Sequence, residues 1–166
     1  MNLPFRLEEM NIALELTPWQ QFGLAFLLGS FAVATWSDLK HLSAQREFVE
    51  IWLLFVFAIL ALDIYHAYQG QASVPMVGLK WGLIAIFSLL AVRRIGILFL
   101  LAPADVAALA AAASLLTPVL VILFYAIAKL IALVIAPWLA RGRPTWPFMP
   151  VVSLATLVIL AFAWWW

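Results

Sequence analysis

Residues 103–118 read PADVAALAAAASLLTP, an alanine-rich apolar stretch that carries one carboxylate, Asp105, near its start. A carboxylate at the centre of a membrane helix costs about 2.5–3.5 kcal/mol on insertion scales. A second stretch, ATWSDLKHL at residues 34–42, places Asp38 at the end of another apolar run. Whether these two carboxylates need a special explanation depends on whether the chain lies in a membrane.

The composition answers that question. Of the 166 residues, 67% are hydrophobic and 10% are charged, and the mean hydropathy is +1.11. A soluble domain carries about 25% charged residues, so this chain has too little polar material to cover a globule of its size. The sequence therefore predicts an all-α, multi-pass protein of the cell membrane.

The charges and the missing residue types exclude several functions. The net charge is +1 and the basic residues are scattered, so no nucleic-acid partner is expected. The chain has no cysteine, which excludes disulfides, thiolate metal sites and cysteine nucleophiles. We predict neither a metal nor a cofactor.

The apolar segments are spaced as six membrane spans. The clear segments are close to the ~20 residues that cross a bilayer core, and lie at about 18–37, 48–68, 74–92, 118–139 and 148–166. The fourth span ends at Thr117, and it is either short, if it starts at Ala104, or broken by Pro103, if it starts at Ile95. Residues 1–17 have the spacing of an amphipathic helix lying on the membrane surface, ahead of a single membrane domain at 18–166.

Lysine and arginine predict the orientation. The connections that follow the first, third and fifth spans hold Lys40, Arg46, Arg93, Arg94, Arg141 and Arg143. The connections on the other side, HAYQGQASV and LLTP, hold none. The positive-inside rule then places the basic connections in the cytoplasm and both termini outside.

This orientation puts Asp38 and Asp105 in the same, cytoplasmic half of the membrane. Two neighbouring carboxylates share a proton, so that one can act as general base on a water while the other donates to a carbonyl. The alternatives are a solvated interfacial carboxylate for Asp38, and an ion pair or a helix N-cap for Asp105.

Three segments resemble one known family, the type IV prepilin and preflagellin peptidases, which are membrane aspartic proteases of the GxGD type. ATWSDLKHL resembles the segment of the first aspartate, and PADVAALAAAASLLTP resembles that of the second. WPFMPVVSLATL, residues 146–157, resembles the start of the last span. Their order, their spacing and the six spans agree with the family over nearly the whole chain.

The resemblance implies a function. Asp38 and Asp105 would be the catalytic pair, and a prepilin-like precursor of a pilin or archaellin would be cleaved at the cytoplasmic membrane face, just before its hydrophobic helix. Lys40, Pro103, Pro147 and Pro150 lie in or beside the matching segments and are expected to support the site.

The family's two glycines before the second aspartate correspond to Ala102 and Ala104. This favours an alternative, a non-catalytic relative that binds prepilin-like segments or scaffolds a membrane assembly. A transporter would be favoured by paired inverted repeats, which the sequence does not show.

Other charged residues have open interpretations. Lys129 falls near the middle of the fifth span, where it either pairs with a carboxylate, in place of the lysine that follows the family's second aspartate, or snorkels. Asp63 and Lys80 are predicted to form a structural ion pair. Glu47 and Glu50 either contact a basic substrate leader or, as we prefer, stabilise a helix N-terminus.

Overall fold

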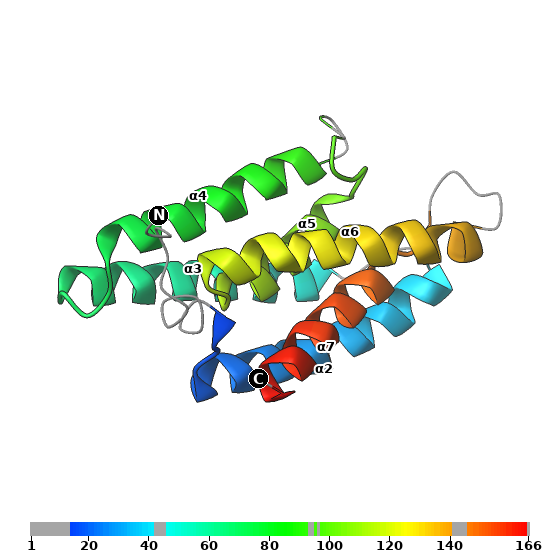
Figure 1. The fold of residues 1–166 in the computed structure, drawn as a ribbon. Coiled ribbons are helices and arrows are strands. Elements are labelled where there is room, and N and C mark those ends of the chain that lie inside the picture. The colour runs from blue at the N-terminus through cyan, green and yellow to red at the C-terminus, as the bar shows by residue number, and fades with distance from the viewer. Residues whose placement is uncertain (1–13, 42–45, 93–94, 96, 141–145, 166) are drawn as a thin grey trace, which may run out of the picture.

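The protein is all-α, as the sequence predicts. The computed structural model describes residues 14–41, 46–92, 95, 97–140 and 146–165, and these form helices and no strand (Figure 1). The helices are α2 (Pro18–His41), α3 (Arg46–Tyr68), α4 (Val74–Ala91), α5 (Pro103–Ser114), α6 (Pro118–Ala140) and α7 (Met149–Trp165). Their bounds agree with the predicted apolar segments to within a few residues. Of the predicted surface helix at 1–17, all but the last four residues lie outside the described part of the chain.

The four helices α2, α3, α4 and α6 are long and apolar enough to cross a membrane. The longest have 23 or 24 residues, which is about 35 Å at 1.5 Å per residue and exceeds a hydrocarbon core of ~30 Å. Helix α7 has 17 residues. Helix α5 has 12 residues and extends about 18 Å, which is too short to cross the core alone. The chain is therefore a membrane protein whose short helix lies among longer ones.

The structure decides between the two versions of the fourth span. Helix α5 begins at Pro103, and the backbone of residues 97–102 is not helical. This connecting segment turns back along the end of α4, where Leu101 N–H donates to Ala91 O at 3.0 Å and Leu98 N–H donates to Leu90 O at 3.0 Å. Its backbone polar groups are thus partly satisfied by a helix end, which is how irregular backbone is tolerated at membrane depth.

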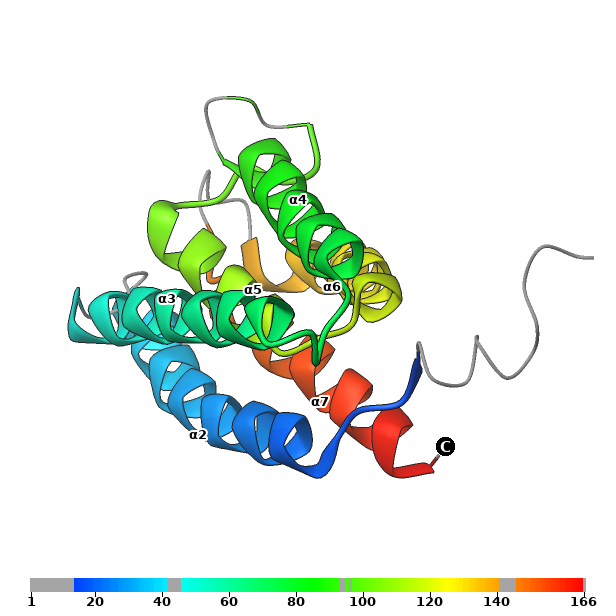
Figure 2. The same ribbon diagram turned by 90° about the vertical axis from the view of Figure 1, so that its left-hand side faces the viewer.

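Helix α5 lies at the centre of the molecule, enclosed by the other helices (Figure 2). Most of its residues after the first turn are buried, including Ala108, Ala111, Ala112 and Ala113. Alanine allows helices to approach closely, and in a membrane this packing replaces the hydrophobic effect as the source of association. The alanine-rich stretch is therefore the core around which the longer helices pack.

Helices α2 and α7 lie side by side and antiparallel (Figure 1). The Thr35 and Ser153 hydroxyls are hydrogen-bonded across this contact at 2.8 Å. Because α2 ends where α7 begins, this packing brings the end of the first helix, with Asp38, to the N-terminus of the last one.

Candidate active site

Asp38 lies in the last turn of α2 and is buried, with 6% of its surface exposed. Its Oδ2 accepts a hydrogen bond from the Met149 backbone N–H at 3.0 Å, and the Phe148 backbone also donates to the carboxylate. These N–H groups belong to the start of α7, where the helix dipole favours a negative charge. Asp38 is therefore not the solvated interfacial carboxylate that was its alternative interpretation. It is buried and held by a helix N-terminus.

Asp105 lies in the first turn of α5. The N-cap of this helix is Ala102, and the carboxylate of Asp105 reaches back to the backbone of Ala102. This is one half of a capping box, in which the third helical residue binds the N-cap N–H. Asp105 is thus not the N-cap itself, but a partly buried carboxylate oriented by its own helix start.

The two carboxylates interact. Asp38 lies close enough to Asp105 for the charge of one to act on the other. They come from helices that are separated in the sequence but packed against each other, and each sits at a helix end. Since two carboxylates that act on each other do not both ionise readily, the arrangement favours one ionised and one protonated member.

The segment that resembles the family's last span lies beside Asp38. Phe148 and Met149 are 2% and 0% exposed, and Pro147 is also buried. Pro150 follows as the second residue of α7, a position at which its missing N–H breaks no helical bond. The three segments that carry the resemblance therefore meet in space.

The sequence did not predict that the backbone N–H groups of Phe148 and Met149 donate hydrogen bonds to Asp38. The helix start flanked by prolines is the signal that could have indicated them.

The alanines at the second aspartate fit the observed backbone. Ala102 has φ −70° and ψ 155°, an extended conformation open to any L-residue. Positive φ, which would call for glycine, is not required there. Pro103 follows as the first residue of α5, where its fixed φ suits a helix start.

Three predicted supporting or substrate-binding residues lie on the surface. Lys40 is exposed and its ammonium lies 4.5 Å from the Trp36 ring centroid. Glu47 is exposed in the first turn of α3, and Glu50 pairs with Arg46 at 2.7 Å on the same helix. An exposed ion pair of this kind contributes little stability, so Glu50 remains accessible to a basic partner.

The predicted ion pair between Asp63 and Lys80 is confirmed. Lys80 Nζ lies 2.7 Å from Asp63 Oδ2, which also accepts a hydrogen bond from Trp81 Nε1 at 2.8 Å. Lys80 is 7% exposed. The pair joins α3 to α4 and lies on other helices than Asp38 and Asp105, which supports a structural role.

Lys129 lies midway along α6 and donates a hydrogen bond to Leu98 O. Its ammonium also lies 5.1 Å from the centroid of the Phe99 ring. Within the described part of the chain it forms no ion pair with a carboxylate, so the first of its two interpretations, pairing with a carboxylate, is not observed there.

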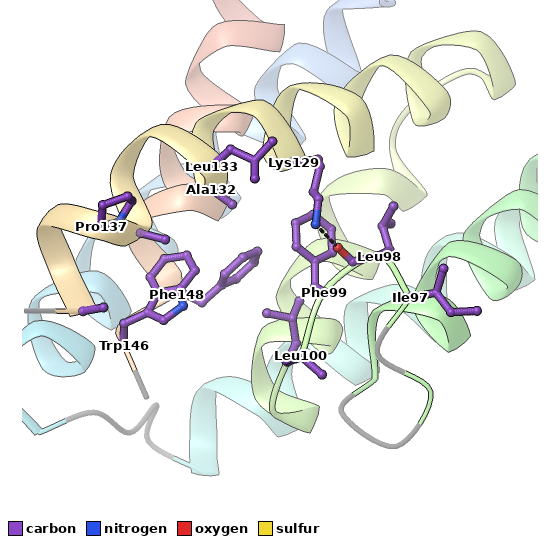
Figure 3. A pocket seen from close by; sticks show the side chains of 13 residues that line it. Ile97, Leu98, Phe99, Leu100, Lys129, Ala132, Leu133, Pro137, Trp146 and Phe148 are labelled. Atoms are coloured by element: carbon purple, nitrogen blue, oxygen red, sulfur yellow. Dashed lines mark hydrogen bonds between the residues drawn. The ribbon is translucent and has the colours of Figure 1, made fainter. Parts of the chain in front are cut away.

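A cavity of about 540 Å³ adjoins this lysine. One wall is the C-terminal half of α6, another is the segment 97–101, and Trp146 and Phe148 close one end (Figure 3). Phe148 lines the cavity with its side chain and binds Asp38 with its backbone. The cavity therefore borders the aspartate pair without containing it.

No group of three or more histidine, aspartate or glutamate side chains that could hold a metal ion occurs among the described residues.

Comparison with known proteins gives no match: no family model, no curated protein and no solved structure matches the chain. What is established is the class, an all-helical membrane protein with an interacting pair of carboxylates held at two helix starts.

Proposed function

We propose that the protein is a membrane aspartic endopeptidase that cleaves the leader of type IV prepilin-like precursors at the cytoplasmic membrane face. The observation that carries this proposal is the interaction of Asp38 with Asp105 at the place where all three family-like segments meet. The likeness to the prepilin peptidases in those segments supports the choice of substrate, a pilin or archaellin precursor.

The pair supports hydrolysis by general acid–base catalysis. The ionised carboxylate takes a proton from a water, whose oxygen attacks the peptide carbonyl carbon, while the protonated carboxyl donates its proton to the carbonyl oxygen. The tetrahedral intermediate then collapses, the C–N bond breaks, and the leaving amine takes up the proton held by the first carboxylate. The N–H groups at the start of α7 orient Asp38 for this reaction, and the backbone of Ala102 orients Asp105.

The position of the pair suits a substrate anchored in the membrane. The distribution of lysine and arginine predicts that the end of α2 and the start of α5 lie on the cytoplasmic side, which supports this proposal. A precursor whose leader lies in the cytoplasm and whose hydrophobic helix spans the membrane would present the bond between them at this level.

The test is cleavage of a tagged prepilin-like precursor co-expressed with the protein and followed by its size on a gel. Wild type is compared with Asp38→Asn and Asp105→Asn, and with Glu15→Gln, which removes an exposed carboxylate elsewhere. We expect cleavage by wild type and Glu15→Gln, and none by the two asparagine variants at equal protein levels. Absence of cleavage by wild type, or cleavage by either asparagine variant at the wild-type rate, contradicts the proposal.

A second candidate function is a non-catalytic relative that binds prepilin-like segments. The observation in its favour is that Asp38 already has a structural task, because its carboxylate caps α7. Co-purification of an uncleaved precursor with wild type and with both asparagine variants would favour this candidate.

A further inference from the structure

Lys129 carries a positive charge at an unusual depth. It lies midway along α6, the most apolar of the membrane-spanning helices. A lysine at that depth costs about 2.5–3.5 kcal/mol on insertion scales, and such residues generally pair with one another or line functional cavities. The contacts of Lys129 are a neutral carbonyl, Leu98 O, and the face of Phe99.

These contacts leave the ammonium with capacity for a further partner. An ammonium has three N–H donors, and the described residues supply one hydrogen-bond acceptor, Leu98 O. The dashed line in Figure 3 marks this bond, on the side of the cavity that the segment 97–101 forms. Lys129 is therefore anchored at the cavity wall, but its charge is not neutralised by any described carboxylate.

The cavity itself is apolar and open to the side. Of the described residues that line it, Lys129 alone is charged. Leu100 and Leu133 on two of its walls are 71% and 61% exposed, so the cavity opens on a surface that lipid tails or another helix would cover. This open cavity is therefore an apolar groove that carries one positive charge.

We propose that this groove receives the transmembrane helix of the substrate, and that Lys129 pairs with a single acidic side chain within that helix's apolar stretch. The depth of Lys129 decides the occupant. A lipid phosphate lies at the edge of a hydrocarbon core ~30 Å thick, well away from its middle, and a soluble anion does not enter it. A carboxylate carried on a helix reaches this depth, and it gains most from a cation already in place there.

The groove also leads to the aspartate pair. It runs along α6 from Lys129 to Ala140 and ends at Trp146 and Phe148. The backbone of Phe148 binds Asp38, and Leu101 in the opposite wall precedes Ala102, whose backbone binds Asp105. A helix lying in the groove therefore directs its cytoplasmic end toward the pair. This inference rests on the proposed function for the identity of the substrate, but the binding it describes does not require cleavage.

The test is binding of a synthetic apolar transmembrane helix to the full-length Asp105→Asn variant in lipid nanodiscs, followed by energy transfer between labels. The helix carries one Glu near its middle or, in the matched peptide, one Gln. We expect the Glu peptide to bind about tenfold more tightly, because a buried charge pair discriminates strongly against a neutral isostere. We expect Lys129→Met to abolish this preference, Lys129→Arg to keep it, and Leu130→Met, on the same helix but outside the cavity, to leave it unchanged.

Reversing the charges of residue 129 and of the peptide provides a second test. Lys129→Glu should prefer a peptide with a central Lys over the Glu peptide. Equal binding of the Glu and Gln peptides to the parent protein, no binding of either, or a preference that survives in Lys129→Met would overturn the inference. If wild type did not cleave the precursor but the preference for the Glu peptide were intact, the proposed peptidase function would be contradicted. The inference that the groove binds a helix would stand.

Discussion

At the residue scale, each important carboxylate is explained by what it contacts. Asp38, at the end of α2, is held by the backbone at the start of α7, and Asp105 is held by the backbone of Ala102 at the start of its own helix, so a helix N-terminus stabilises each carboxylate. Asp63 has a different solution, an ion pair with Lys80 and a hydrogen bond from Trp81. The first two carboxylates interact with each other, whereas the third is neutralised by a lysine. This difference distinguishes the candidate catalytic pair from a carboxylate with a structural role.

Replacement of Asp38 should separate its structural role from its chemical one. Asp38→Asn keeps a side-chain oxygen that can accept the Met149 N–H, whereas Asp38→Ala removes it. Loss of a cap of this kind costs about 1 kcal/mol. We expect Asp38→Ala to unfold more readily than wild type in detergent, Asp38→Asn to unfold close to wild type, and both to lack peptidase activity. Full activity in Asp38→Asn would show that the residue acts only as a cap.

The ion pair between Asp63 and Lys80 should matter most when it is broken on one side. Lys80→Met leaves the carboxylate of Asp63 without its cation in a largely buried place, since the side chains are 9% and 17% exposed. Removal of one partner of a buried pair costs about 3–5 kcal/mol. We expect Lys80→Met to be clearly less stable than the double variant Asp63→Asn/Lys80→Met in a denaturant titration. If the single variant proved the more stable of the two, the pair would not be a stabilising contact.

At the element scale, small side chains decide how closely the helices pack. The alanines of α5 lie against its neighbours, and Gly23 in α2 lies against Leu115 at the end of α5. A Cβ built at Gly23 would be 2.8 Å from Leu115 Cδ1, whereas one at Gly29 would meet nothing within 4 Å. The two glycines of one helix therefore form a matched pair for measuring the packing.

We predict that Gly23→Ala destabilises the protein and Gly29→Ala does not. Leu115 is 1% exposed and has little room to move, and overpacking of this kind costs about 1–3 kcal/mol. At Gly29 the added methyl meets no neighbour, and the helix gains from the better propensity of alanine. Thermal unfolding in detergent, monitored by tryptophan fluorescence, measures both variants. Equal melting temperatures for the two would show that α2 does not approach α5 as closely as the structure has it.

At the scale of the whole molecule, the distribution of charge predicts how the protein sits in its membrane. The connection between α3 and α4 has no lysine or arginine, whereas the connections on the opposite side contain both. The turn after α3 passes through Gly70 with φ +72°, and neighbouring Gln71 is exposed. Arg46, at the start of α3, is exposed at the other end of the same helix.

Because the chain has no cysteine, single substitutions can report this orientation directly. We expect Gln71→Cys to react with a membrane-impermeant maleimide in intact cells, and Arg46→Cys to react only after permeabilisation. The physical reason is the retention of basic connections in the cytoplasm. The reverse labelling pattern would show that the topology is inverted and that the aspartate pair lies at the outer face. That result would be incompatible with cleavage on the cytoplasmic side.

The class of the protein, the approximate bounds of its helices and the ion pair between Asp63 and Lys80 could all be predicted from the sequence. These follow from hydropathy and residue depth, which are properties of single segments. The structure alone decided that the fourth span is a short helix starting at Pro103, that α7 caps Asp38, and that Lys129 faces a cavity instead of a carboxylate. Each of these depends on how two or more helices pack, and hydrophobic periodicity carries no information on which faces meet when every helix is apolar nearly all round.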